Sequence, residues 1–234
     1  MIKSSLTDVV RLTTNFNSRP EWCKITRITP HCVVGQFKAE EVASWDKFKS
    51  GGKASANYII GRDGELLLNV AEEHRAWTSG TRSTNIAEPN YNDYGAITIE
   101  CASGNKYPYE FNDAVFNKLI LLCADICRRY DKNKLVWLPD KAEALKYEAT
   151  HPDDMIITIH RWFENVECCG QWLIDKMPEL VLKVNDLLGY PLTTETLYCV
   201  QVGAFAHKEN ADRLKQELIK KGYYDAFIVE KRRS

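Results

Sequence analysis

Three residues of the sequence have side chains that zinc prefers and lie where a folded chain can direct them to one point. His31 and His160 each end a run of strand-forming residues, and Cys168 follows His160 by eight positions, just before a predicted helix. A catalytic zinc ion takes three protein ligands and keeps a fourth position open for water. A thiol near a helix N-terminus also has a lowered pKa, which favours metal binding. For each residue taken alone, an ordinary hydrogen-bonded role is the more common outcome.

An acidic residue occurs in a matching pattern on another predicted strand. Because side chains alternate across a strand, Thr158 and His160 share one face of their strand, and Thr98 and Glu100 share one face of theirs. The isoleucines between them point the other way. A carboxylate on an otherwise apolar strand is costly unless it is paired or functional, so Glu100 is a candidate catalytic group.

The composition excludes several other classes of function. The 234 residues include 31 Lys and Arg against 32 Asp and Glu, a balance that leaves no basic face for nucleic acid. No stretch approaches the roughly 18 apolar residues of a membrane span. The N-terminus lacks the features of a secretion signal, and the eight cysteines have the irregular spacing of reduced thiols. We therefore expect synthesis in the cytoplasm, no nucleic-acid partner and no membrane insertion.

The elements that must position these residues alternate between strand and helix. Predicted strands cover residues 24–30, 58–61, 66–68, 96–101, 135–137 and 155–160, and predicted helices cover residues 39–49, 113–130, 141–147 and 171–188. Asp63-Gly64 predicts a hairpin turn. Residues 78–95 are rich in Ser, Thr, Asn, Gly and Pro and predict a long loop. The pattern is typical of an α/β fold with a central mixed β-sheet flanked by helices.

A small C-terminal unit follows a break in the pattern. The chain divides into a catalytic domain over residues 1–189, a linker over 190–196 and a βαβ unit over 197–234. In that unit, residues 197–202 and 226–229 predict strands and residues 210–221 predict a helix. A βαβ unit of this length is too small to bury a core alone. We expect it to pack on the main domain, on a second copy or on a partner.

Five short motifs occur in a fixed order along the first domain. They are Ile25-Thr26-Arg27-Ile28-Thr29-Pro30-His31, Ser55 to Gly64, Arg75-Ala76-Trp77, Asn92-Asp93 followed by Ala96 to Glu100, and His160 with Cys168-Cys169-Gly170. In this order they resemble the zinc N-acetylmuramoyl-L-alanine amidases, a family that includes phage lysins, bacterial wall-recycling amidases and peptidoglycan recognition proteins. The resemblance covers the chain from about Ile25 to Val184.

The resemblance implies a cofactor, a substrate and roles for four residues. It implies that Zn²⁺ is held by His31, His160 and Cys168, and that Glu100 moves a proton between the zinc-activated water and the leaving amine. It implies bacterial peptidoglycan as the substrate. The bond hydrolysed would be the amide between N-acetylmuramic acid and L-alanine.

The sequence departs from the family pattern at two positions. Cys169 replaces a proline that usually follows the Cys ligand, so it competes with Cys168 for the third ligand position, although the spacing favours Cys168. Val166 stands where relatives carry a Lys or Thr that polarises the scissile carbonyl, and a valine cannot do this. The candidates for contact with the substrate or for a compensating hydrogen bond are Asn57, Arg75, Trp77, Thr78 and Thr158.

The C-terminal unit resembles one repeat of the SPOR wall-binding domains through Tyr198-Cys199-Val200-Gln201-Val202-Gly203-Ala204-Phe205. Such domains contain two βαβ repeats on one sheet, and this chain has one. A homodimer could supply the missing half, because a lone βαβ unit leaves an open sheet edge.

The sequence thus predicts a peptidoglycan amidase with a wall-binding appendage. That combination, without a secretion signal, favours a phage or prophage endolysin that acts on the cell wall after release. A recognition module that binds the wall with weak or no catalysis is the alternative; Val166 favours it, and the retention of Cys168 argues against it. A purely structural zinc site is a third class and would need four protein ligands.

Overall fold

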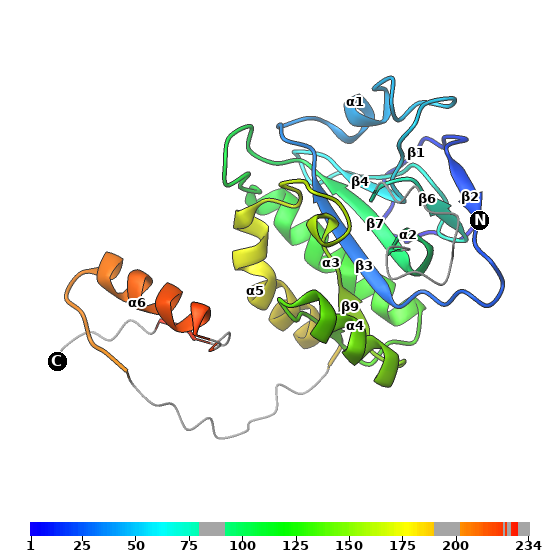
Figure 1. The fold of residues 1–234 in the computed structure, drawn as a ribbon. Coiled ribbons are helices and arrows are strands. Elements are labelled where there is room, and N and C mark those ends of the chain that lie inside the picture. Colours follow the sequence, from blue (N-terminus) through cyan, green and yellow to red (C-terminus); the bar gives the residue numbers. More distant parts are fainter. Residues whose placement is uncertain (80–91, 190–201, 222, 224–225, 229–234) are drawn as a thin grey trace. The chain divides into compact units, whose positions relative to one another are not determined.

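The structure is a computed structural model that describes residues 1–79, 92–189, 202–221, 223 and 226–228 (Figure 1). The chain forms two compact units, Met1–Leu192 and Thr193–Ser234. The first unit contains all of the candidate site residues.

A seven-stranded, mostly parallel sheet forms the centre of the first unit, in the order β1-β5-β4-β7-β3-β9-β8. The strands in that order are Val9–Val10, Leu66–Leu68, Tyr58–Ile60, Ala96–Cys101, Arg27–Cys32, Met155–Ile157 and Leu135–Val136. β4 and β5 form the antiparallel hairpin predicted at Asp63-Gly64, where Gly64 has a φ of 81°. The predicted α/β fold with a central mixed sheet is confirmed.

Two helices cover one face of this sheet. α3 (Asp113–Arg129) and α5 (Gln171–Leu187) pack together in Figure 1 and share the larger hydrophobic core with the isoleucines of β7. The side chain of Asn112 caps α3 by accepting a hydrogen bond from the backbone N–H of Val115, as its position before the helix suggests. α4 (Lys141–Thr150) lies between β8 and β9 in the sequence.

The opposite face of the sheet is divided into an apolar and a polar half. α1 (Ala39–Ala43) and the segment after it cover Ile59 of β4 and Leu67 of β5 in a smaller hydrophobic core. The next strands along this face, β7 and β3, carry Thr98, Glu100, Thr29 and His31 instead, because Ile59 lies opposite Glu100 in the register. The candidate site therefore lies over β7 and β3, next to the smaller hydrophobic core over β4 and β5.

Two predicted elements end earlier than the sequence pattern suggests. The helix predicted over residues 39–49 stops at Ala43, and the Asn15 amide holds the turn that follows by donating to the carbonyls of Lys47, Phe48 and Lys49. The strand predicted over residues 155–160 stops at Ile157, where its pairing with β3 also ends. His160 begins a 3₁₀ turn, η1 (His160–Trp162), instead of ending a strand.

Other elements were not predicted at all. Within the predicted loop over residues 78–95, a short helix, α2, spans Asn92–Gly95, and residues 80–91 lie outside the described residues. The short strands β1, β2 (Phe16–Ser18) and β6 (His74–Ala76) are also additional, and β2 pairs with β6 in a separate two-stranded sheet.

In the second unit the structure describes one helix, α6 (Lys208–Lys220), which matches the predicted helix over residues 210–221. The strand predicted over residues 197–202 lies outside the described residues except for Val202, and residues 226–228 are irregular rather than strand. Val202, Phe205, Tyr223 and Phe227 are exposed. None of the helices in the described part of the chain is long and apolar enough to cross a lipid bilayer.

Candidate metal centre

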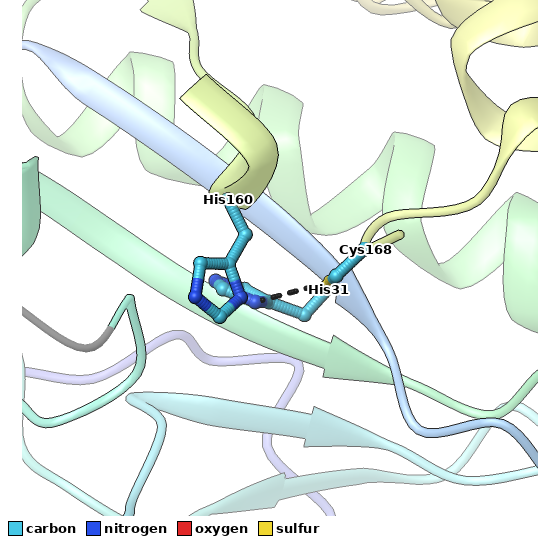
Figure 2. Close-up of side chains that lie close together, drawn as sticks. All are labelled: His31, His160 and Cys168. Atoms are coloured by element: carbon cyan, nitrogen blue, oxygen red, sulfur yellow. Dashed lines mark hydrogen bonds between the residues drawn. The ribbon is translucent and has the colours of Figure 1, made fainter. Parts of the chain in front are cut away.

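Three side chains from three segments meet at the polar half of the sheet face. His31 comes from β3, His160 from η1 and Cys168 from the turn before α5, and their ligand-type atoms all lie within 4.8 Å of one another (Figure 2). The ring centroids of the two histidines are 4.9 Å apart, and Cys168 Sγ lies 3.3 Å from His31 Nδ1. Among the described residues, no fourth His, Cys, Asp or Glu joins this group.

Two buried nitrogens at this site have no hydrogen-bond partner among the residues that the structure describes. They are Nε2 of His31 and Nε2 of His160. Glu164 Oε2 lies 3.4 Å from His160 Nε2, a contact that is favourable when the imidazole is protonated. Buried polar atoms are nearly always hydrogen-bonded, because desolvation is otherwise uncompensated. Together with the nearby thiol, these two nitrogens form a group of donors that could hold a metal ion.

The turn that carries Cys168 depends on the glycine after Cys169. Gly170 has a φ of 86°, and a Cβ atom built there would approach the carbonyl oxygen of Pro108 to 2.8 Å. Only glycine fits this close approach and this backbone conformation. The backbone N–H of Arg161 donates to the carbonyl of Cys168 at 3.2 Å, which ties the turn to η1.

Cys169, the alternative candidate for the third ligand, does not lie in this group. Cys169 is fully buried in the larger hydrophobic core, and burial raises the pKa of its thiol to about 12. The group with the two histidines contains Cys168 and not Cys169.

The surroundings of His31 and Cys168 shift the pKa values of both side chains towards the neutral form. Burial and the nearby His160 charge lower the pKa of His31 well below 6.5, so its imidazole is neutral at pH 7 and has a free lone pair. A hydrogen bond with Cys32, together with burial, raises the pKa of the Cys168 thiol well above 9. A cation that binds this thiol must therefore displace its proton.

Glu100 lies next to the group on the central strand. In the register it is opposite His31 on β3 and opposite Ile59 on β4. Burial raises the pKa of this carboxyl from 4.5 to about 7, and the positive charge of Lys47 partly offsets the effect. A carboxyl with a pKa near 7 can both accept and release a proton at neutral pH.

Two of the candidate substrate residues are part of the interior. The Asn57 amide donates to three backbone carbonyls between β5 and β6, and its oxygen accepts from the N–H of Thr98. Thr158 hydrogen-bonds Thr29 and Asn92. The Asn57 and Thr158 side chains are fully buried, so neither is exposed to a substrate in this conformation.

The other three candidates are half-buried. Thr78 Oγ1 hydrogen-bonds the carbonyl of Ser55 and Oγ1 of Thr98, which precedes Glu100 by two residues. Arg75 and Trp77 both donate to Asn17 Oδ1, at 2.9 and 2.7 Å. These bonds fix the orientation of a guanidinium and an indole at the surface.

The sequence reasoning missed Lys47, Asn92 and Thr29. Lys47 lies inside the helix predicted over residues 39–49 and carries no motif. Thr29 could have been found, because Thr29-Pro30-His31 repeats the pattern of Thr98-Ile99-Glu100 and of Thr158-Ile159-His160.

A group of metal-ligand side chains beside a carboxyl that titrates near pH 7 is typical of metal-dependent hydrolases. Residues 21–165 match the family profile described as N-acetylmuramoyl-L-alanine amidase, and residues 194–234 match that of the SPOR domain. Since the first match spans more than half of the chain, the protein belongs to the N-acetylmuramoyl-L-alanine amidase family. It is a peptidoglycan hydrolase that cleaves the amide bond between N-acetylmuramic acid and L-alanine.

Solved structures share the fold at low sequence identity. PlyL superposes with a TM-score of 0.50 and 13% identity, covering 75% of this chain and 94% of that one. A selenomethionine derivative of AmpD gives a TM-score of 0.50 and 17% identity, covering 77% of this chain and 99% of that one. No curated protein sequence matches the chain. The predicted family, fold and enzyme class are thus confirmed.

Proposed function

We propose that the enzyme is a zinc amidase of the endolysin type, in which His31, His160 and Cys168 hold the ion and Glu100 moves the proton. The observation that carries the proposal is the close group of His31, His160 and Cys168, in which both buried Nε2 atoms lack a hydrogen-bond partner among the described residues. Two imidazoles and one thiol suit zinc, and three donors rather than four leave a position open for catalysis. A purely structural zinc site would require a fourth donor.

The catalytic steps follow from the residues around the group. Zinc, when bound, lowers the pKa of a water molecule to about 7 and polarises the scissile carbonyl. Glu100 takes the proton from the attacking water and passes it to the nitrogen of the leaving L-alanine, which its pKa of about 7 permits. The neutral state of His31 keeps its lone pair free for the metal.

Contacts with the substrate come from the half-buried residues beside the site. The Trp77 indole offers an aromatic face to a sugar ring, and the Arg75 guanidinium suits a carboxylate of the peptide stem. Their shared acceptor, Asn17 Oδ1, holds both in place. Thr78 is a third contact, next to the strand that carries Glu100.

The second unit is proposed to hold the enzyme on its insoluble substrate. The SPOR match over residues 194–234 supports peptidoglycan binding, and the exposed Phe205, Tyr223 and Phe227 support pairing with a second copy. We expect the intact chain to be a dimer in light scattering at micromolar concentrations. Monomers across that range would contradict the pairing and leave the amidase assignment unaffected.

The test of the catalytic proposal combines metal analysis with product analysis. Digestion of purified peptidoglycan is expected to release peptides with free N-terminal L-alanine, and the purified enzyme to contain one zinc ion. His160→Ala should lose both zinc and activity, and Glu100→Gln should keep zinc and lose turnover by about 100-fold or more. His151→Ala, on an exposed histidine that stacks on Tyr147, is the matched control and should change neither.

Several outcomes would contradict this assignment. New reducing sugar ends would mean that a glycosidic bond is cut, and normal lysis by Glu100→Gln would remove its role. Tight wall binding without any new ends would favour the non-catalytic recognition module.

A further inference from the structure

The backbone pairing between the two strands that lead to the histidines ends before it reaches them. β3 and β9 are paired at Arg27 with Ile156 and at Ile28 with Ile157, and the last backbone bond runs from the N–H of Thr158 to the carbonyl of Ile28 at 3.0 Å. β3 continues to Cys32 along β7, while the chain after Ile157 leaves the sheet and enters η1. The backbone ladder of these two strands therefore does not fix the spacing of His31 and His160.

Beyond the last backbone hydrogen bond, side-chain hydrogen bonds join the two segments. Oγ1 of Thr29 and Oγ1 of Thr158 are 2.7 Å apart. Thr158 Oγ1 donates to Asn92 Oδ1 at 2.7 Å, and Asn92 Nδ2 donates to Thr29 Oγ1 at 2.8 Å. With Thr29 donating to Thr158, the three bonds form a closed ring in which every member both donates and accepts. We call Thr29, Thr158 and Asn92 the polar lock.

The polar lock joins the two segments at a point two residues before each histidine. Thr29 precedes His31 by two residues and Thr158 precedes His160 by two, so along β3 Thr29 is on the same face as His31. All three side chains of the lock are fully buried. The remaining amide hydrogen of Asn92 goes to Ser79 Oγ at 3.3 Å, so the lock also joins the segment after β6.

The chemistry of the lock indicates a purpose other than filling space. Valine has nearly the shape of threonine and would pack at both strand positions without the desolvation of a hydroxyl. A buried polar network is favourable only when every group is satisfied, as here, and it then permits one geometry of the segments that it joins.

We propose that the polar lock sets the distance between His31 and His160 and thereby the affinity of the metal centre. Thr29, Thr158 and Asn92 are positioning residues, because they act through the two histidines and do not contact metal or substrate. The proposal rests on the proposed zinc centre. It adds a determinant that neither the ligand set nor the family match identifies.

The test compares zinc affinity in full-length variants at neutral pH. Thr158→Val removes the hydroxyl at constant shape and is expected to raise the zinc dissociation constant about tenfold, the lower end of the range for groups that orient metal ligands. Thr158→Ser retains the hydroxyl and should restore the wild-type constant. Competition with a chromophoric chelator measures both. The visible spectrum of the cobalt(II)-substituted protein should change in Thr158→Val and not in Thr158→Ser, because the band shape reports ligand geometry.

A matched control separates positioning from general loss of stability. Thr13→Val removes another buried threonine hydroxyl, one that accepts a hydrogen bond from the N–H of Asn15 in the N-terminal segment. It should lower the melting temperature without changing the zinc constant. If Thr158→Val does not fold, Thr29→Val removes the same bond from the other strand and replaces it in the comparison.

Two results would overturn the proposal. One is wild-type zinc affinity in Thr158→Val, and the other is equal weakening of zinc binding in Thr13→Val. If the wild-type protein itself does not bind zinc in the chelator competition, the proposed zinc centre is wrong, and this outcome is distinct from the two above.

Discussion

Glu100 is expected to destabilise the metal-free protein at neutral and alkaline pH. Its pKa is about 7 in the native state, against an ordinary value of 4.5 in an unfolded chain. The native state therefore binds the proton more tightly than the unfolded state. The contribution of Glu100 to the free energy of unfolding is therefore most favourable below about pH 4.5. It falls as the pH rises towards 7 and is constant above that. The difference between the two pKa values corresponds to about 3 kcal/mol. Because Glu100 keeps some exposed surface, screening by solvent reduces the expected loss of folding free energy to about 2 kcal/mol.

The variant that isolates this effect is Glu100→Gln. Glutamine has the shape of the protonated acid and cannot ionise. We expect the variant to match the wild type near about pH 4.5 and to be more stable by about 2 kcal/mol near about pH 8. Urea unfolding of the chelator-treated proteins, followed by circular dichroism across this pH range, measures the difference from the midpoints at constant slope.

The same urea unfolding experiment, applied to a second variant, provides the control. Glu21→Gln, on an exposed side chain, should show no comparable pH-dependent gain. Addition of zinc should reduce the gain in Glu100→Gln, because a nearby cation favours the carboxylate. A stability difference between wild type and Glu100→Gln that stays the same at all pH values would refute the reasoning, since burial of an ionisable carboxyl requires it to vary.

Three further predictions concern the residues around the metal centre. Cys168→Ser should lose zinc and Cys169→Ser should retain it, as measured by metal analysis of the purified proteins. Val166→Lys, at a 38% exposed position, should raise kcat about tenfold by placing a cation where relatives carry one, and an unchanged or lower kcat would contradict this. Lys47→Gln removes the charge that lowers the pKa of Glu100, so the acidic limb of the pH–activity profile should move to higher pH; a shift to lower pH would show that another group controls that limb.

Patterns that depend on neighbouring residues predicted much of the fold from the sequence. β7 has the predicted bounds, because alternating isoleucines and polar residues define a strand with one buried face. The Asp63-Gly64 hairpin and the Asn112 cap follow from local backbone chemistry alone. The same alternation placed Thr98 and Glu100 together on one face of β7, where the register pairs them with Thr29 and His31.

The elements that sequence patterns missed depend on contacts distant in the chain. β2 has little strand character of its own and pairs with β6, which lies 58 residues further along. The helix from Ala39 ends at Ala43, and the turn that follows is held by the distant Asn15 amide, which donates to the carbonyls of Lys47 and Lys49. The sequence predicts Asn57 as a substrate contact, whereas the structure buries its side chain completely. No local pattern contains this information.

The electrostatics of the site explain why a carboxyl, a thiol and two imidazoles can share one buried region. The pKa of His31 is lowered and the pKa values of Glu100 and the Cys168 thiol are raised, so without a metal each of these three groups is shifted towards its neutral form. Burial is the main cause of the shifts of His31 and Glu100, and the hydrogen bond with Cys32 is the main cause of the shift of Cys168. A divalent cation reverses this balance, because it favours the carboxylate and the thiolate over their protonated forms. Metal binding and readiness for proton transfer are therefore coupled, since the ion that completes the site also helps to ionise the base that the reaction needs.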